Sequence, residues 1–180
     1  MTSEIIVLGV GNILFSDDGL GIRVVKKLLE RYRFPDSVTI VDGGVLGINL
    51  LGIISHARHL IVVDTILNKG KPGDLHRLAG PDIPNRVLAK NSLHQVDLLE
   101  ALTLCQLLDH VPSTVIVGVE PKDLETLATE LTPPVEAQVD NLILMVLEEL
   151  KLLGILCDKR DPEELKNLYL ANPEGYRPPC

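Results

Sequence analysis

Four aspartates, Asp17, Asp18, Asp42 and Asp64, follow short apolar runs of the sequence. If those runs are parallel strands of one sheet, their carboxyl ends meet at one edge, where ligands of open α/β sheets gather. Carboxylates that are crowded at one edge repel one another unless protons, cations or helix N-termini compensate their charge. A cation compensates well, so the pattern indicates a metal site or an acid–base centre.

His94 could add a nitrogen ligand to this group. Ser92 begins a predicted helix with the capping-box pattern SLHQ, and His94 falls in its first turn. The helix dipole disfavours the imidazolium form there, so the ring stays neutral and able to bind a metal. Two carboxylates and one imidazole suit Ni²⁺ or Zn²⁺ better than Ca²⁺ or Cu⁺, and they leave coordination positions open for substrate or water.

Each of these residues also has a purely structural interpretation, which the residues alone leave open. These interpretations are a helix cap for Asp17 or Asp18, a turn former for Asp42, a turn cap for Asp64 and a helix-surface residue for His94. The remaining histidines are interpreted as surface or packing residues: His56, His59, His76 and His110.

A glycine-rich turn after the first apolar run raises the alternative of a dinucleotide-binding enzyme. The sequence GVGN at 9–12 begins like the GxGxxG fingerprint, but Leu14 stands where its third glycine belongs. Asp17 and Asp18 lie at the predicted helix start that would receive the pyrophosphate, and like charges there repel by a few kcal/mol. We therefore expect no nucleotide cofactor.

The elements that must position these residues alternate between strand-like and helix-like patterns. Apolar runs at 5–8, 38–41 and 60–63 predict strands covered on both faces, 114–119 predicts a fourth, and a weaker alternation at 75–78 predicts a more exposed fifth. Apolar stripes of helical period occur at 20–32, 46–54 and 98–108, and again from Thr132, with Pro133 at the first position, to Gly154. This alternation predicts a layered α/β domain.

Composition limits the function classes. The chain has 180 residues and a formal net charge of −8, which suits one domain and opposes nucleic-acid binding. No apolar run approaches the roughly 20 residues of a membrane span, and the start of the chain lacks the basic segment of a signal peptide. Three cysteines without metal-site spacing favour a reduced, cytoplasmic compartment. We expect a domain over 1–154 and a partly mobile tail over 155–180.

Six strings occur in an order that resembles the maturation endopeptidases of [NiFe]-hydrogenases. They are GVGNILFSDDGLGIRV, VDGG, HLIVVDT, NSLHQ, VGVEP and LTPPVEAQV, and they span roughly residues 4 to 154. The resemblance implies a three-layer α/β/α fold around a five-stranded, mostly parallel mixed sheet, with the 75–78 strand antiparallel. It also implies an activity: removal of the C-terminal extension of the hydrogenase large-subunit precursor once nickel has been inserted.

The resemblance carries over residue by residue to the acidic edge. Asp18, Asp64 and His94 match the family's metal ligands, although some members have glutamate in place of Asp18. Asp42 matches the aspartate of the DGG turn, which is implicated in activity. Val45 stands where the family often has a small polar residue.

These residues suggest a mechanism. We expect nickel in the precursor to be the recognition element and to polarise the scissile carbonyl or activate a water. Asp42 or Asp18 would act as general base, with backbone N–H groups of Gly43 and Gly44 binding substrate and stabilising the oxyanion.

The expected partner is the large-subunit precursor, and the expected state is a monomer. Another function class stays open, a nickel-dependent chaperone of the precursor without catalysis. Cleavage by the unaltered chain would separate the two, because only an enzyme turns the precursor over.

Overall fold

The computed structural model describes residues 4–44, 50–80, 83, 102–105 and 111–161. In the described part, five strands form one sheet, and their order across the sheet is β3-β1-β4-β6-β5. These strands are β1 (Ile5–Val10), β3 (Val38–Gly44), β4 (His59–Thr65), β5 (Leu75–Ala79) and β6 (Ser113–Val119). Only β5 runs antiparallel to its neighbour among these five, so the predicted mixed sheet with one antiparallel strand is confirmed.

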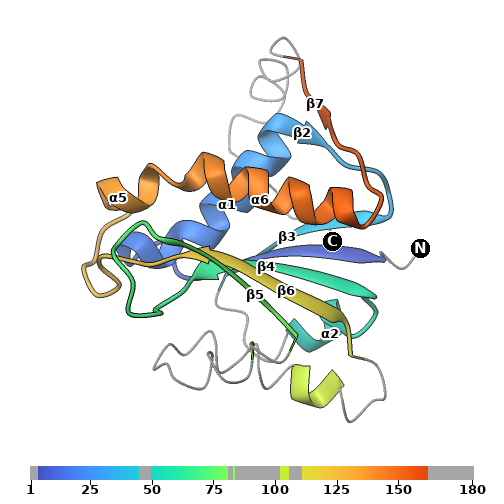
Figure 1. Cartoon of the computed structure of the whole chain (residues 1–180), viewed down its shortest axis with the longest axis horizontal. Coiled ribbons are helices and arrows are strands. Elements are labelled where there is room, and N and C mark those ends of the chain that lie inside the picture. Colours follow the sequence, from blue (N-terminus) through green and yellow to red (C-terminus); the bar gives the residue numbers. More distant parts are fainter. Residues whose placement is uncertain (1–3, 45–49, 81–82, 84–101, 106–110, 162–180) are drawn as a thin grey trace.

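Helices cover both faces of this sheet (Figure 1). Helix α1 (Leu20–Arg31) and helix α6 (Val139–Leu152) pack together on one face, and α2 (Leu50–Ile54) lies on the other. The short helix α5 (Pro133–Glu136) leads into α6. The three-layer α/β/α architecture is therefore the one that the resemblance implies.

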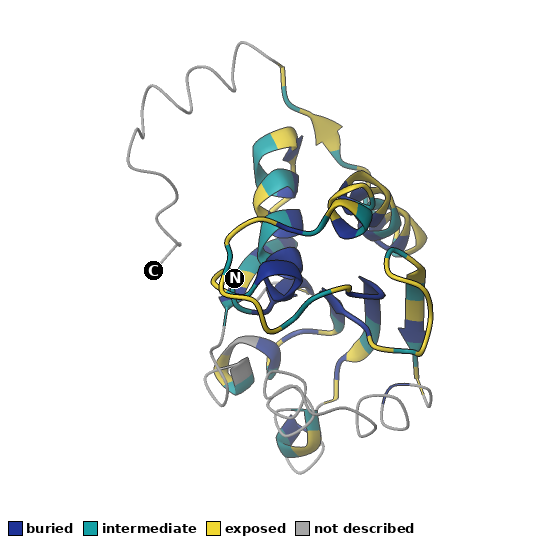
Figure 2. Cartoon of the chain, turned by 90° about the vertical axis from the view of Figure 1, so that its left-hand side faces the viewer, coloured by how far each residue is buried: buried dark blue, intermediate teal, exposed yellow. Residues whose placement is uncertain are grey.

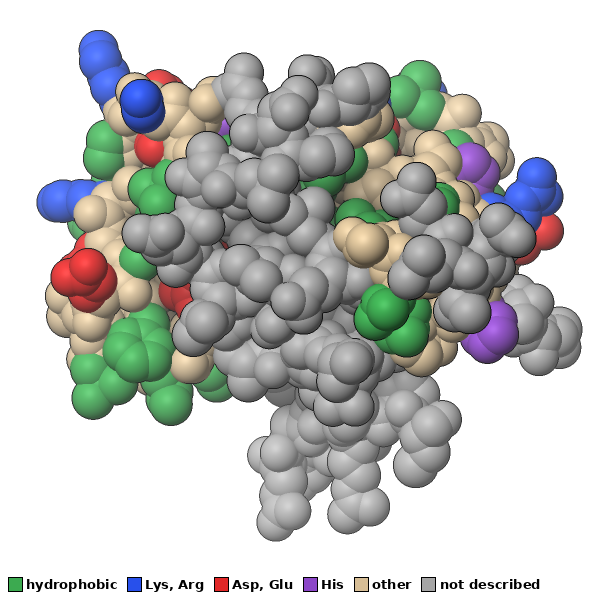
Figure 3. Space-filling view, turned by 90° about the horizontal axis from the view of Figure 1, so that it is seen from below, with side chains coloured by type: hydrophobic (Ala, Val, Ile, Leu, Met, Phe, Trp, Pro, Cys, Tyr) green, Lys and Arg blue, Asp and Glu red, His purple; other side chains and the backbone are tan. Residues whose placement is uncertain are grey.

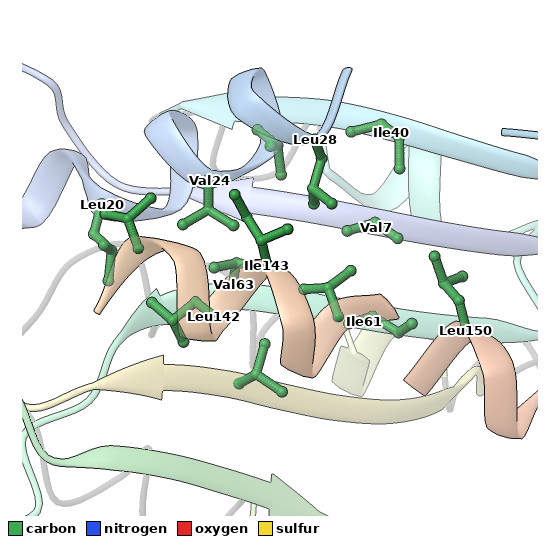
Figure 4. Packing of buried hydrophobic residues seen from close by; sticks show 14 of the residues in the cluster. Val7, Leu20, Val24, Leu28, Ile40, Ile61, Val63, Leu142, Ile143 and Leu150 are labelled. Carbon is green, nitrogen blue, oxygen red and sulfur yellow. The ribbon is translucent and has the colours of Figure 1, made fainter. Parts of the chain in front are cut away.

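The hydrophobic core is split by the sheet into two clusters, as alternating side chains of buried strands require. On the α1 and α6 face, Leu20, Val24 and Leu28 of α1 pack with Leu142 and Leu150 of α6 over the strands (Figure 4). The cluster on the α2 face contains the alternate positions of the same strands, such as Ile6, Leu8, Leu60 and Val62. Burial on both faces explains why these strands are unbroken apolar runs in the sequence.

Packing continues past Gly154, the predicted end of the domain. Strand β7 (Asp158–Lys159) pairs with β2 (Tyr32–Arg33) in a second, two-stranded sheet. The Arg160 side chain donates hydrogen bonds from Nε to the carbonyl oxygens of Leu29 and Tyr32, at 3.0 and 3.1 Å. The folded domain therefore extends to about this point, and the rest of the predicted tail lies outside the described residues.

The register brings the carboxyl ends of three parallel strands to one edge. Gly9 of β1 stands opposite Asp42 of β3 on one side and opposite Val63 of β4 on the other. Asp64 is the next residue of β4, so the predicted gathering of strand ends is correct. Figure 2 looks onto this edge of the molecule. In the part of the chain that the structure describes, no helix is long and apolar enough to cross a membrane.

Candidate functional site

Asp17 is a structural residue, although its neighbour in the acidic pair is a predicted ligand. It lies in the 3₁₀ turn η1 (Ser16–Gly19), and its side chain is fully buried. Its carboxylate accepts the backbone N–H groups of Lys122, Asp123 and Thr132, at 2.9, 2.9 and 2.7 Å. The Thr132 hydroxyl donates to the same carboxylate at 2.9 Å instead of capping its own helix. Asp17 thus ties the β6–α5 connection to the first loop.

Asp18 lies in the same turn and is positioned by a very close backbone approach. A Cβ atom at Gly11 would lie 1.8 Å from the Asp18 carbonyl oxygen, and Gly11 has a φ of 129°. The Asn12 N–H donates to Asp18 Oδ2 at 2.9 Å, so the carboxylate is held back over the loop that follows β1. The N-cap residue of α1 is Gly19, which supplies no side-chain cap. The Asp17 carboxylate bonds to residues 122–132 instead of the start of α1, so the helix-cap interpretation is wrong for Asp17.

The same hydrogen bond bears on the dinucleotide alternative. In a phosphate-binding turn, backbone N–H groups after the first strand are free to meet the phosphate. Here the Asn12 N–H is already donated to Asp18, a carboxylate of the same charge sign as phosphate. A phosphate would have to displace a carboxylate that is only 9% exposed.

Asp64 ends β4 beside this turn. It is 4% exposed, and its Oδ1 accepts the N–H of Thr65 at 2.7 Å. The turn η1 contacts β4, and the start of α1 packs tightly against both strand ends, since a Cβ at Gly21 would lie 2.3 Å from the Val63 carbonyl oxygen. Two buried carboxylates thus lie in neighbouring elements, Asp18 in η1 and Asp64 at the end of β4.

Asp42 differs from these two acids because it is exposed. Its Oδ1 accepts the Gly44 N–H at 3.0 Å, so the predicted turn-forming role is present. Gly44 has a φ of 45°, in the left-handed region that favours glycine, and it lets the chain turn back toward the carboxylate. Among the described residues, the second oxygen of Asp42 has no hydrogen-bonding partner, so it is available to a water or a substrate.

His94 lies outside the described residues, so the structure does not test its predicted place beside the carboxylates. Among the residues that are described, no group of three histidine, cysteine or acidic side chains is arranged to hold a metal ion. The ligand set Asp18, Asp64 and His94 therefore stays a prediction. Gly43 is buried directly against Leu8, where a Cβ would lie 2.7 Å from Leu8 Cδ1.

One buried acid at the same edge was missed by the sequence reasoning. Glu120, directly after β6, accepts the Asn68 N–H with both oxygens, at 2.7 and 3.0 Å, and lies 3.0 Å from Nε2 of His76. The signal was an acidic residue at a strand end, the same signal that singled out Asp42 and Asp64. Glu120 fastens the connection from β4 to β5 where it crosses the end of β6, and His76 is its packing partner.

Exposed hydrophobic side chains lie around the acidic edge. Ile13, Leu14 and Leu127 are 49%, 51% and 75% exposed, and the Ala128 N–H donates to the Leu14 carbonyl at 3.0 Å. Figure 3 shows hydrophobic side chains gathered at this end of the molecule, next to acidic ones. Such surfaces mark interaction sites more often than isolated exposed residues do.

The model of the hydrogenase maturation protease family matches residues 22–149 of this chain. The chain belongs to this family. The hydrogenase 2 maturation protease of Escherichia coli is 39% identical over 154 residues, which are 84% of this chain and 93% of that protein. A hydrogenase expression/formation protein of Bradyrhizobium diazoefficiens, HupD, is 38% identical over 94% of this chain and 90% of its own length.

Solved structures agree with this assignment. The hydrogenase maturating endopeptidase HybD of Escherichia coli superposes with a TM-score of 0.83 at 38% identity, over 87% of this chain and 98% of that one. The [NiFe] hydrogenase maturation protease HybD of Thermococcus kodakarensis gives a TM-score of 0.67 at 25% identity, over 82% and 98%. Family membership makes the chain a peptidase of hydrogenase maturation, and the acidic edge is its candidate active site.

Proposed function

We propose that this chain removes the C-terminal extension of a [NiFe]-hydrogenase large-subunit precursor, and that it recognises the nickel that the precursor already carries. The observation that carries the proposal is the pair of buried carboxylates, Asp18 in the turn η1 and Asp64 at the end of β4, which η1 contacts. Nickel is here part of the substrate. Asp18, Asp64 and His94 would bind it through the coordination positions that the precursor leaves open.

The geometry favours separate places for nickel recognition and for hydrolysis. Asp42 is on β3 and Asp64 is on β4, with β1 between them, so their backbones are about 10 Å apart. Ile40 and Val62 belong to the clusters on opposite faces of the sheet, and residues two positions further along point to the same faces. Nickel at Asp64 is therefore too far from Asp42 to share one water with it, and recognition is its favoured role.

Asp42 is the favoured general base. Its hydrogen bond from Gly44 fixes one carboxylate oxygen, and the other, which no described residue bonds, is left for a water that attacks the scissile carbonyl. The Gly44 N–H can stabilise an oxyanion only after it leaves Asp42. In this arrangement Gly43 and Gly44 shape the turn that presents Asp42, and their proposed contact with substrate is through the same turn.

The test uses nickel-loaded and nickel-free precursor side by side, with cleavage followed by gel shift and by mass. We expect a single C-terminal cut in the nickel-loaded sample alone. Equal cleavage of both samples would refute nickel recognition, and binding without cleavage by the unaltered chain would replace the protease with a nickel-dependent binding partner.

Two variants separate the two roles. Asp42→Asn keeps an oxygen for the Gly44 N–H but removes the base, so we expect association with the loaded precursor to persist while cleavage falls by 10²-fold or more. Asp64→Asn is expected to weaken association itself. If Asp42→Asn cleaves at the rate of the unaltered chain, then Asp42 is not the base.

A further inference from the structure

Strand β3 is an edge strand whose outward backbone groups can be assigned from the register. Ile5 stands opposite Val38, and its N–H donates to the Ser37 carbonyl at 3.1 Å. In a parallel ladder, successive residues turn their N–H and C=O groups to alternate sides. Ser37 therefore faces β1, and so do the odd positions 39 and 41. Ile40 and Asp42 turn their backbone groups outward, away from the sheet.

No strand or loop among the described residues pairs with these outward groups. β3 is paired with β1 alone, and the Val38 N–H is already donated to the Pro35 carbonyl at 2.9 Å. The side chains do not protect the edge either, since the strand contains no lysine or proline and reads Val-Thr-Ile-Val before Asp42. Folded proteins normally blunt such an edge, and an open β-branched edge accepts an added strand.

Figure 4 shows β3, with Ile40, outermost in the sheet and its side chain turned to the core. Because Ile40 is 6% exposed, its side chain anchors the strand, while no described residue bonds its outward backbone groups. Two residues further along stands Asp42, the favoured base, followed by the turn that holds its carboxylate. The open edge thus leads directly to the catalytic carboxylate.

We propose that the C-terminal segment of the hydrogenase precursor binds in extended form as an added strand along β3, so that its scissile bond comes to rest beside Asp42. This inference rests on the proposed function. The occupant is argued from continuity, because the free groups of Ile40 and Asp42 end at the residue that acts on the peptide. An added strand lies about 4.8 Å from β3, which is within reach of the Asp42 side chain.

This binding mode has two consequences for the substrate, one for its sequence and one for its geometry. Main-chain hydrogen bonds read no side-chain sequence, so the edge would align many different peptides, and selection would depend on the nickel end of the site. Three strand spacings, roughly 14 Å, separate an added strand from β4 and Asp64. The nickel and the scissile bond of a cleavable precursor should therefore be about that far apart.

Amide hydrogen exchange of the full chain tests the added strand directly. The Asp42→Asn variant is mixed with nickel-loaded precursor, and exchange is read at single residues. We expect the amides at positions 40 and 42 to slow at least tenfold, while those at 39 and 41, which β1 already protects, do not change. Nickel-loaded mature large subunit, which lacks the extension, is the control and should protect neither.

The outcomes separate this inference from the proposed function. If the unaltered chain does not cleave the loaded precursor, the proposed function fails and the inference with it. If cleavage occurs but positions 40 and 42 gain no protection, or are already slow in the free chain because another segment pairs there, only the added strand is overturned. Protection by the mature subunit would likewise overturn it.

A second measurement needs no change to this chain. Precursor extensions can be attached by chemical ligation with one backbone amide N-methylated at a time around the scissile bond. An added strand bonds through every second residue, so N-methylation should reduce the cleavage rate at alternate positions and spare those between. A uniform effect along the segment would overturn the proposal.

Discussion

Replacing Asp17 should lower the free energy of unfolding more than the same replacement of its neighbour Asp18. The Asp17 carboxylate is fully buried and accepts three backbone N–H groups and one hydroxyl, all within 2.9 Å. Each buried donor that loses its acceptor costs about 1–3 kcal/mol. Three of these donors bond to Oδ2, and only the Thr132 N–H bonds to Oδ1. Asp17→Asn can keep its oxygen at the Oδ2 position but then turns its amide nitrogen toward the Thr132 N–H, so that bond is lost. We expect a loss of about 1–3 kcal/mol in the free energy of unfolding.

Asp18→Asn is the matched control. The same substitution one residue later leaves an oxygen for the Asn12 N–H, which donates to Asp18 Oδ2 at 2.9 Å. We expect stability to change by less than about 1 kcal/mol. Cleavage of nickel-loaded precursor should nevertheless be lost, since Asp18 is the proposed ligand.

The assay is denaturant unfolding followed by far-ultraviolet circular dichroism, because the chain has no tryptophan. Cleavage is measured in parallel at a temperature where both variants are folded. If Asp17→Asn is within 1 kcal/mol of the unaltered chain, the hydrogen bonds do not carry the stability assigned to them. Equal destabilisation by the two variants would refute the division of roles between the adjacent acids.

Three further predictions concern stability and reactivity. Arg77→Met should destabilise the fold by about 1–2 kcal/mol, because it leaves the largely buried carboxylate of Glu149, which accepts from Arg77 Nε at 2.6 Å, without its partner. A double Arg77→Met/Glu149→Met variant should recover most of this loss in the same denaturation assay. A single variant as stable as the unaltered chain would contradict the prediction. Hydrogen bonds from Thr126 hold the pKa of Asp123 below its ordinary value of 3.8. The ionised carboxylate therefore stabilises the fold above that pH, and this contribution is lost as the pH falls through the folded-state pKa. Asp123→Asn should make Tm depend less on pH in this acid range, and an unchanged slope would contradict the prediction. Burial raises the pKa of the Cys105 thiol, so little of the reactive thiolate is present in the native chain. Peptide mapping after treatment with iodoacetamide should find Cys105 unmodified in the native chain and modified after unfolding. Modification in the native chain would show instead that the thiol is accessible.

The strands could be predicted from the sequence because burial on both faces leaves a simple pattern. Ile61 and Val62 point to opposite faces, yet both are buried, so the run has no polar interruption. Two-residue strands leave no such pattern, and the pairing of β2 with β7 was missed for that reason. It depends on contacts between segments more than 120 positions apart, such as Arg160 with Leu29. The predicted single helix from Thr132 to Gly154 is instead α5 followed by α6, with the Gln138 N–H bonded to the Val135 carbonyl in a tighter turn between them.

The acidic edge could be placed from the sequence because strand ends determine it, but the role of each acid could not. Asp17 and Asp18 are adjacent and chemically identical, and no periodicity distinguishes them. The difference comes from partners at 122–132, which lie more than 100 positions away and whose backbone N–H groups leave no trace in residue type. Backbone donors are present at almost every residue, so only the folded chain shows which carboxylate meets them.

The edge contains two kinds of acid, and their roles differ. A buried carboxylate that accepts four hydrogen bonds is fixed in place, and both of its oxygens are already used by the protein. Asp17 can therefore hold the loop that carries Asp18 without competing for the substrate. Asp42 accepts one hydrogen bond at Oδ1, and its other oxygen has no partner among the described residues. A general base requires this combination of a fixed orientation and an unused lone pair. The number of donors around each carboxylate, rather than its position in a motif, therefore separates the acid that supports the site from the acid that works in it.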